Sequence, residues 1–235
     1  MQDNQHEQEF SLKSLIFPLT TFKAINIIIF VGLLVFGNVL FNGFVWDDNL
    51  FIINNPDVHT LNIAHLFTAN KFNAISYYRP VSAVYFAFLY SIFGTNAFFY
   101  HFMQIALHII NVILVYILVR NLFQRIDLKS SPLKIEFSNL IILFLSLVFL
   151  VHPINVESVA YIAASQSELL FLFGILALLI SIKKSIATKQ LILVSILLLL
   201  SILTKEVGIL FLFMVLLFQF LFNRQRFLKF FYGQV

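Results

Sequence analysis

The sequence has 235 residues and a net charge of +4 at pH 7, with 60% hydrophobic residues and only 11% charged residues. Soluble domains carry about twice that share of charge, so most of this apolar surface has to face lipid. The lack of cysteine excludes disulfide and thiol chemistry, and basic residues clustered between apolar runs indicate membrane orientation, with no nucleic-acid partner.

The chain divides into three predicted regions. Residues 1–23 are polar and are expected to form a cytoplasmic N-terminal tail. Residues 24–223 are expected to form a multi-span membrane domain, because each apolar run approaches the ~20 residues that cross a bilayer. The six apolar runs are residues 24–43, 99–120, 138–152, 168–182, 190–204 and 207–223. Residues 224–235 form a basic tail that we expect to mark a truncation point.

A seventh apolar stretch, residues 81–93, follows Pro80 and ends before Gly94. As a span it would be short, and it would move most of the later basic residues to the outside. With six spans and an internal N-terminus, only Lys71, Arg79 and Lys205 lie outside, as the positive-inside rule favours. We therefore predict an all-α bundle of about six transmembrane helices. Residues 43–98 would form a long outer loop that contains a short surface helix.

The first candidate residues are Asp47 and Asp48, at the outer end of the first run. Two adjacent carboxylates can bind a divalent cation, or one can act as a general base. Two solvated acids at a helix end would look the same. At the far end of the outer loop, Arg79 precedes Pro80.

Polar residues also interrupt the second run, where His101, His108 and Asn111 fall on one helix face. That face has to point away from lipid. The three side chains could line a groove for a lipid phosphate, but hydrogen bonding between helices is the commoner use of such residues.

Three further outer turns carry ionisable residues. His152 and Glu157 flank Pro153 after the third run, where they could serve a metal or phosphate site or simply cap a helix. Glu168 lies near the mouth of the fourth run. Lys205 and Glu206 follow the fifth run, where they could neutralise each other, or the lysine could contact a phosphate. A six-span topology places all of these residues on the outer face, together with Asp47, Asp48 and Arg79. A site for a charged, lipid-attached substrate would require this arrangement.

The order of these motifs resembles the polyprenol-dependent membrane glycosyltransferases of GT-C architecture, and most of all the transmembrane-and-tetratricopeptide (TMTC) type of O-mannosyltransferase. The resemblance covers roughly residues 44 to 208. Its motifs are Trp46-Asp47-Asp48, Asn54-Asn55-Pro56-Asp57-Val58, Tyr78-Arg79-Pro80-Val81-Ser82, Phe93-Gly94-Thr95-Asn96, Tyr100-His101, Leu107-His108 with Asn111, Val151-His152-Pro153 with Glu157-Ser158-Val159-Ala160, Ser167-Glu168-Leu169-Leu170 and Lys205-Glu206-Val207-Gly208.

The resemblance implies a catalytic acid at Asp47 or Asp48 and a sugar donor carried on a polyprenyl phosphate. It implies a divalent metal, Mg²⁺ or Mn²⁺, for which Asp48 and His152 are the candidate ligands. The residues expected to bind substrate, His152 among them, are Arg79, His152, Glu157, Glu168, Lys205 and Glu206. The chain departs from the family at Asn155, where animal members carry a second histidine, and at residues 165–168, which lack the family's arginine.

We therefore expect a transferase that moves a sugar to a protein or glycan hydroxyl on the outer or lumenal face. The alternative is a non-catalytic membrane component, such as a scaffold or a flippase or transporter subunit, or an inactive fragment of the transferase. A composition rich in Phe, Ile, Asn and Lys and free of cysteine favours a bacterial inner membrane over an endoplasmic-reticulum membrane.

Overall fold

The computed structural model describes residues 18–68, 77–126, 132–183 and 187–222. Most of the predicted N-terminal tail, all of the basic tail at 224–235 and Lys71 lie outside these residues. Every regular element within the described residues is helical, which confirms the all-α prediction.

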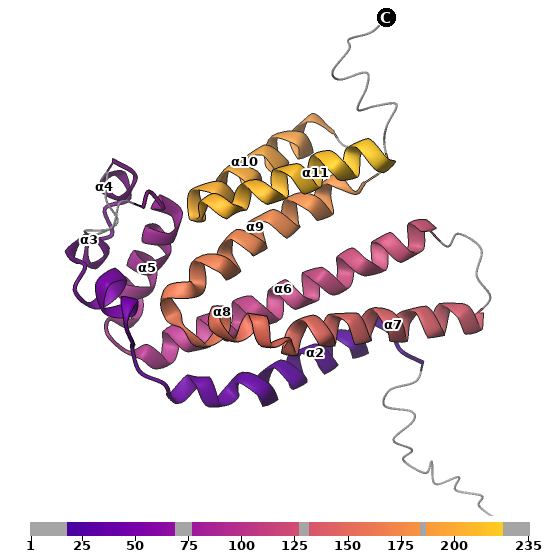
Figure 1. Ribbon diagram of the computed structural model, residues 1–235, viewed down its shortest axis with the longest axis horizontal. Coiled ribbons are helices and arrows are strands. Elements are labelled where there is room, and N and C mark those ends of the chain that lie inside the picture. The colour runs from indigo at the N-terminus through magenta and orange to yellow at the C-terminus, as the bar shows by residue number, and fades with distance from the viewer. Residues whose placement is uncertain (1–17, 69–76, 127–131, 184–186, 223–235) are drawn as a thin grey trace, which may run out of the picture.

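Each of the six apolar runs forms a long helix, and successive helices run in opposite directions (Figure 1). The helices are α2 (Thr21–Phe36), α6 (Ala97–Ile126), α7 (Pro132–Val151), α9 (Ser165–Ser181), α10 (Thr188–Thr204) and α11 (Ile209–Phe222). Several begin a few residues before the apolar run because polar side chains cap them. In α2, for example, the Thr20 hydroxyl accepts a hydrogen bond from the backbone N–H of Lys23.

Three helical segments are long and apolar enough to cross a membrane: Thr21–Phe41, Ala97–Arg125 and Ile162–Ser181. A fourth span results if Ile135–Val151 and Pro153–Ala160 are counted as one helix bent by 46°. Helix α10 and the segment Glu206–Phe222 are apolar but have only 17 residues each, or about 25 Å. The chain is thus a membrane protein whose described residues include three or four clear spans, and the predicted count of six is not established.

The long outer loop folds into short helices at one end of the bundle, which we call the outer end (Figure 1). They are the π-helical η2 (Asn49–Ile53), α3 (Pro56–His59), α4 (Ile63–Thr68) and α5 (Pro80–Phe93). Helix α5 has 14 residues and spans about 21 Å, so it falls short of a ~30 Å bilayer core. Its buried face, including Phe86 and Leu89, packs with Tyr100 of α6 and Ile162. This agrees with the prediction that residues 81–93 are not a full span.

Two apolar clusters hold the long helices together. One joins α2, α6 and α7 through residues such as Ile28, Val112 and Leu150. The other joins α9, α10 and α11 through residues that include Leu198 and Phe211. Large apolar side chains are also exposed along the bundle, as lipid-facing helices require.

The chain after α7 bends sharply at Pro153 and then forms three short elements at the outer end. They are the 3₁₀ turn η3 (Pro153–Asn155), helix α8 (Val156–Ala160) and the 3₁₀ turn η4 (Ile162–Ala164). We call residues 152–164 the outer elbow. Proline ends α7 because its ring and missing N–H cannot continue a helix. The elbow therefore stays at the outer end, beside the first outer loop.

Candidate functional site

A cavity of about 450 Å³ lies at the outer end, between the first outer loop, the outer elbow and the ends of α9 and α10. Four of the eight predicted site residues line it: Asp47, Arg79, Glu157 and Lys205. The first outer loop is therefore folded against the outer ends of the later helices. The six-span topology predicted that these four residues lie together at the outer face.

The two adjacent aspartates point to different places. Asp48 is fully buried, and its carboxylate accepts hydrogen bonds from the backbone N–H groups of Val45 (2.9 Å) and Ala163 (2.7 Å). Burial raises the pKa of Asp48. The two backbone hydrogen bonds act in the opposite direction, because they stabilise the ionised carboxylate. Asp48 thus joins the loop to the outer elbow, while Asp47 lines the cavity.

The turn just before the two aspartates is strained at Trp46, whose φ of 46° lies in the left-handed region. A bulky residue rarely adopts this conformation, and strained residues often occur at functional sites. The Trp46 ring contacts Tyr161 edge-on, and the Tyr161 hydroxyl accepts a hydrogen bond from the Asp47 backbone N–H at 3.0 Å. Burial raises the pKa of Tyr161 to about 12, so this hydroxyl stays protonated at neutral pH.

Arg79 joins three parts of the outer end. Its guanidinium donates two hydrogen bonds to the Glu206 carboxylate, at 3.0 and 2.6 Å, and a third to Gln166 Oε1 at 2.7 Å. It also stacks over the Tyr77 ring at 4.4 Å. The hydrogen bonds from Arg79 lower the pKa of Glu206 to about 2. Glu206 is therefore a partner of Arg79 and not a residue that lines the cavity.

Lys205 does not neutralise its neighbour, because Glu206 is paired with Arg79. Its ammonium group donates to the Ser167 hydroxyl at 3.3 Å and lines the cavity. Within the described part of the chain, Lys205 forms no ion pair. It is thus a cation that can receive an anionic ligand without losing a carboxylate partner.

His152 and Glu157 lie in the outer elbow but have different roles. His152 Nδ1 accepts a hydrogen bond from the Ile154 backbone N–H at 3.2 Å, which caps η3, and His152 does not line the cavity. Glu157 lies in the first turn of α8, is exposed and lines the cavity. Together with Asp47 it adds a second carboxylate to a cavity lining that also contains Arg79 and Lys205.

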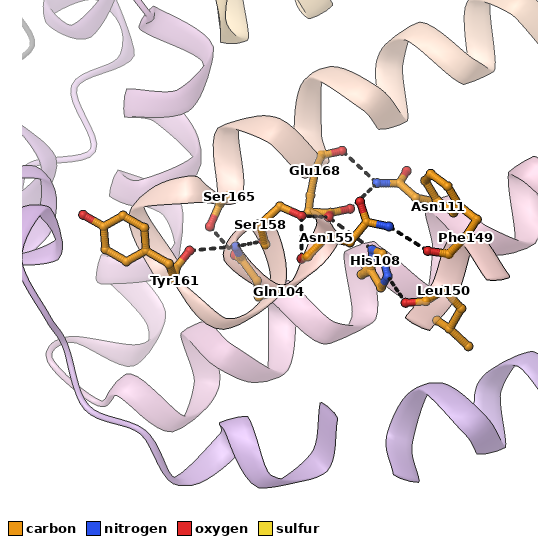
Figure 2. A network of polar contacts seen from close by, with 10 residues as sticks. All are labelled: Gln104, His108, Asn111, Phe149, Leu150, Asn155, Ser158, Tyr161, Ser165 and Glu168. Atoms are coloured by element: carbon orange, nitrogen blue, oxygen red, sulfur yellow. Dashed lines mark hydrogen bonds and ion pairs between the residues drawn. The ribbon is translucent and has the colours of Figure 1, made fainter. Parts of the chain in front are cut away.

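Glu168 is buried and does not line the cavity. Figure 2 shows it within a network of polar side chains from neighbouring helices. Its carboxylate lies 3.1 Å from His108 Nδ1, and it accepts hydrogen bonds from the side chains of Asn111 and Ser158, both at 2.7 Å. The His108 Nε2 lies 3.0 Å from the Leu150 carbonyl and donates to it, because a carbonyl only accepts. His108 and Asn111 are therefore interhelical hydrogen-bond partners, as the sequence favoured.

The same network holds the outer elbow in place (Figure 2). Gln104 of α6 donates to the carbonyls of Ser158 (2.5 Å) and Tyr161 (3.1 Å), and Ser165 donates to Gln104. Asn155 donates to the Phe149 carbonyl at 2.6 Å. Asn155, Ser158 and Tyr161 also line the cavity, so the buried polar groups fix the position of its wall.

Sequence reasoning missed several residues of the wall, chiefly Tyr161, Gln166 and Ser158. Gln166 carried a usable signal, since a carboxamide in the first turn of an apolar helix needs a polar partner. Tyr161 and Ser158 carried none, because their roles come from contacts to α6 and to the first outer loop.

The two predicted metal ligands, Asp48 and His152, make separate contacts with the backbone. Asp48 is buried against backbone N–H groups, and His152 caps η3 outside the cavity. Among the residues that the structure describes, no three His, Asp or Glu side chains are grouped as metal ligands would be. The carboxylates that face the cavity are Asp47 and Glu157.

Comparison with known proteins confirms the resemblance to TMTC-type O-mannosyltransferases. A protein O-mannosyl-transferase of Caenorhabditis elegans is 29% identical over 192 residues, which cover 78% of this chain and 26% of the relative. Protein O-mannosyl-transferase TMTC3 of Mus musculus is 28% identical over 70% of this chain and 17% of the relative. Protein O-mannosyl-transferase TMTC1 of Homo sapiens is 30% identical over 62% of this chain and 16% of the relative. The chain thus spans about a quarter or less of the length of these relatives. No family model and no solved structure matches it.

Proposed function

We propose that this chain forms the catalytic part of a membrane glycosyltransferase that moves a mannosyl group from a polyprenyl-phosphate donor to a protein hydroxyl. The sugar and the acceptor class come from the names of the relatives. The observation that carries the proposal is the cavity at the outer end, where Asp47 and Glu157 share a wall with Lys205 and Arg79. Mixed charges of this kind suit a neutral hydroxyl acceptor and an anionic donor.

Asp47 is the proposed general base. It is exposed and lines the cavity, and its backbone is held by the hydrogen bond to Tyr161. Its carboxylate would take the proton of the acceptor hydroxyl as the oxygen attacks the anomeric carbon and the bond to the donor phosphate breaks. Attack from the face opposite the phosphate inverts the anomeric centre. A base in this role contributes about 10²- to 10⁴-fold to the rate.

Lys205 is the proposed partner of the leaving phosphate. Phosphate departs with its bonding electrons and needs charge stabilisation rather than a proton. Lys205 offers this charge at the loss of one hydrogen bond to Ser167. Arg79, in contrast, is held by Glu206 and Gln166, so its main role is to fix the first outer loop against α9 and α10.

A divalent cation, Mg²⁺ or Mn²⁺, fits this cavity only through Asp47, Glu157 and the phosphate oxygens of the donor. Mg²⁺ in proteins is commonly bound by one or two carboxylates together with substrate phosphates. Its contribution would be to neutralise phosphate charge. The proposed role of Lys205 does not depend on it.

The position of the cavity suits a lipid-linked donor. Ile154 lines the cavity and is 77% exposed, and Trp46 beside Asp47 is 83% exposed. Aromatic residues at the level of the lipid headgroups anchor membrane proteins at the interface. A polyprenyl tail would lie along the apolar bundle while its phosphate enters the cavity. The reported relatives are animal proteins, so they favour an endoplasmic-reticulum membrane and give no support to a bacterial inner membrane.

The test is transfer of labelled mannose from a polyprenyl-phosphate donor in proteoliposomes. Asp47→Asn removes the base and nearly preserves shape, so we expect activity to fall by about 10²-fold or more. Asp57→Asn is the matched control, because Asp57 lies in the same outer loop but not in the cavity wall. Full activity of Asp47→Asn, in a preparation that transfers mannose, would refute the role of Asp47.

A non-catalytic role is the second candidate, and one observation favours it: Arg79 and Glu206 pair with each other, as residues of a purely structural surface would. The two candidates differ in donor binding. The transferase requires the donor to bind, and Lys205→Gln should weaken this binding. If the wild-type chain binds no polyprenyl-phosphate sugar under conditions where it is folded, the non-catalytic role is the better account.

A further inference from the structure

A second cavity, of about 480 Å³, lies at the end of the bundle opposite the outer end. Its wall comes from the last turns of α6, α9 and α11. The lining residues are Asn121, Gln124, Arg125, Leu179, Ile182, Lys183 and Phe222. Helix α9 contributes to both cavities, since Gln166 in its first turn faces the outer cavity and Leu179 near its last turn faces the second. About 25 Å of helix separates its two ends.

Contacts between the helices fix the wall of this second cavity. Gln219 of α11 donates a hydrogen bond to the Ser181 carbonyl at 2.8 Å, which satisfies a carbonyl in the last turn of α9. The Arg125 guanidinium lies over the Phe218 ring, 5.5 Å from its centre. These contacts fix the positions of α6, α9 and α11 around the cavity, and they orient Arg125 toward α11.

The described lining combines basic, carboxamide and apolar side chains. Arg125 and Lys183 supply two positive charges, and no acidic side chain is among the lining residues that the structure describes. Neither cation forms an ion pair with a described residue. The carboxamides of Asn121 and Gln124 add N–H donors, and Leu179, Ile182 and Phe222 add an apolar surface.

We propose that this second cavity binds the phosphate headgroup of an anionic membrane phospholipid. Arg125 and Lys183 would contact the phosphate, the two carboxamides would donate to its oxygens or to the glycerol, and the acyl chains would follow the exposed apolar face of α11. Basic pockets between membrane helices at the positively charged membrane face bind anionic headgroups in this way. The proposal does not depend on transferase activity at the outer end.

A lipid fits these observations better than a free phosphate ester. Much of the lining is apolar, and Leu217 and Leu221 of α11 are 57% and 62% exposed. A soluble ester would leave that apolar surface in contact with water. Two cations at the ends of helices also serve membrane orientation and the helix dipole without any ligand, and only a binding measurement separates this use from a lipid site.

The experiment is native mass spectrometry of the whole chain, with phosphatidylglycerol or phosphatidylcholine titrated into the detergent. We expect one phosphatidylglycerol to bind at least tenfold more tightly than phosphatidylcholine. The double substitution Arg125→Gln with Lys183→Gln should remove this preference. Lys189→Gln is the matched control, because Lys189 begins α10 at the same end of the bundle but does not line the cavity, and it should leave binding unchanged.

Three results would overturn the proposal. They are equal binding of the two lipids, unchanged binding by the double variant, and full displacement of phosphatidylglycerol by millimolar glycerol 3-phosphate, which would make a soluble ester the ligand. Size-exclusion chromatography checks that the variants are folded. If the double variant fails this check, Lys183→Gln and the charge-retaining Arg125→Lys replace it, with weakened and retained binding expected respectively.

Discussion

At the scale of single residues, Asp47 and Asp48 have the same chemistry but different surroundings, so they should respond to different measurements. Replacing Asp48 by Ala leaves the buried N–H group of Ala163 without an acceptor, at roughly 1–3 kcal/mol, and also removes the acceptor of the part-buried N–H group of Val45. We expect Asp48→Ala to lower thermal stability clearly and Asp48→Asn to lower it less, since Asn keeps one acceptor oxygen.

Thermal unfolding in detergent, followed by intrinsic fluorescence, would measure these differences. Asp47→Ala is the matched comparison, because the Asp47 side chain is exposed and should affect activity with little change in stability. Equal stability of Asp48→Ala and the wild-type chain would contradict the anchoring role of Asp48.

The sequence could locate the aspartate pair at the outer end but could not divide the two roles. That division depends on the left-handed turn at Trp46 and on the backbone N–H of Ala163, which is 115 positions away in the chain. The same limit applies to Glu168. Its position near the outer end of an apolar run predicted a cavity residue, but the partners that bury it come from α6 and α8.

The pair of Arg79 and Glu206 gives a pH dependence. The pKa of Glu206 is lowered from 4.5 to about 2 in the folded chain, so the pair stabilises the fold fully above the ordinary pKa. This contribution is lost as the pH falls from about 4.5 to about 2. We expect Glu206→Gln to be less stable than the wild-type chain at pH 7 and to approach it near pH 2 to 3. Thermal unfolding of both chains across this range is the measurement, and a difference that does not vary with pH would count against the pair.

At the scale of elements, the buried network couples α6, α9 and the outer elbow. Glu168→Leu leaves polar groups of His108, Asn111 and Ser158 without their acceptor, and each buried donor left unsatisfied costs about 1–3 kcal/mol. We expect Glu168→Leu and His108→Leu each to be strongly destabilising. The double variant should be clearly less destabilised than the sum of the two.

A double-mutant cycle measures this coupling, which for residues in contact is usually about 0.5–3 kcal/mol. Tyr116→Phe provides a reference buried position in α6 that is not part of the network drawn in Figure 2. Strict additivity of the two network substitutions would show that His108 and Glu168 do not act together.

Apolar runs predicted the existence and order of all six long helices, because burial in lipid leaves a continuous hydrophobic signal. The same signal gave the short helix at 81–93, and the distribution of basic residues predicted that it is not a span. The fold of the outer elbow was beyond prediction. Its helical turns are three to five residues long. Its position is set by a hydrogen bond that Gln104 donates to it and one that Glu168 accepts from it, rather than by periodicity.

At the scale of the whole molecule, the central question is whether the hairpin of α10 and α11 crosses the membrane. Its helical segments of 17 residues reach about 25 Å, against a hydrocarbon core of ~30 Å. Yet the turn between them carries Lys205 into the outer cavity and Glu206 to Arg79. A local thinning of the bilayer accommodates such a mismatch at modest cost. We therefore predict that α10 and α11 both cross the membrane, despite their length.

Site-directed labelling tests this directly, because the chain contains no cysteine of its own. Single substitutions Glu157→Cys and Val207→Cys place a thiol at exposed positions of the outer end, and Lys183→Cys and Lys189→Cys place one at the opposite end. In sealed membranes of one orientation, an impermeant maleimide should label the first two from one side and the last two only from the other. If Val207→Cys is labelled from the same side as Lys189→Cys, the hairpin does not cross, and Lys205 and Asp47 cannot share a cavity.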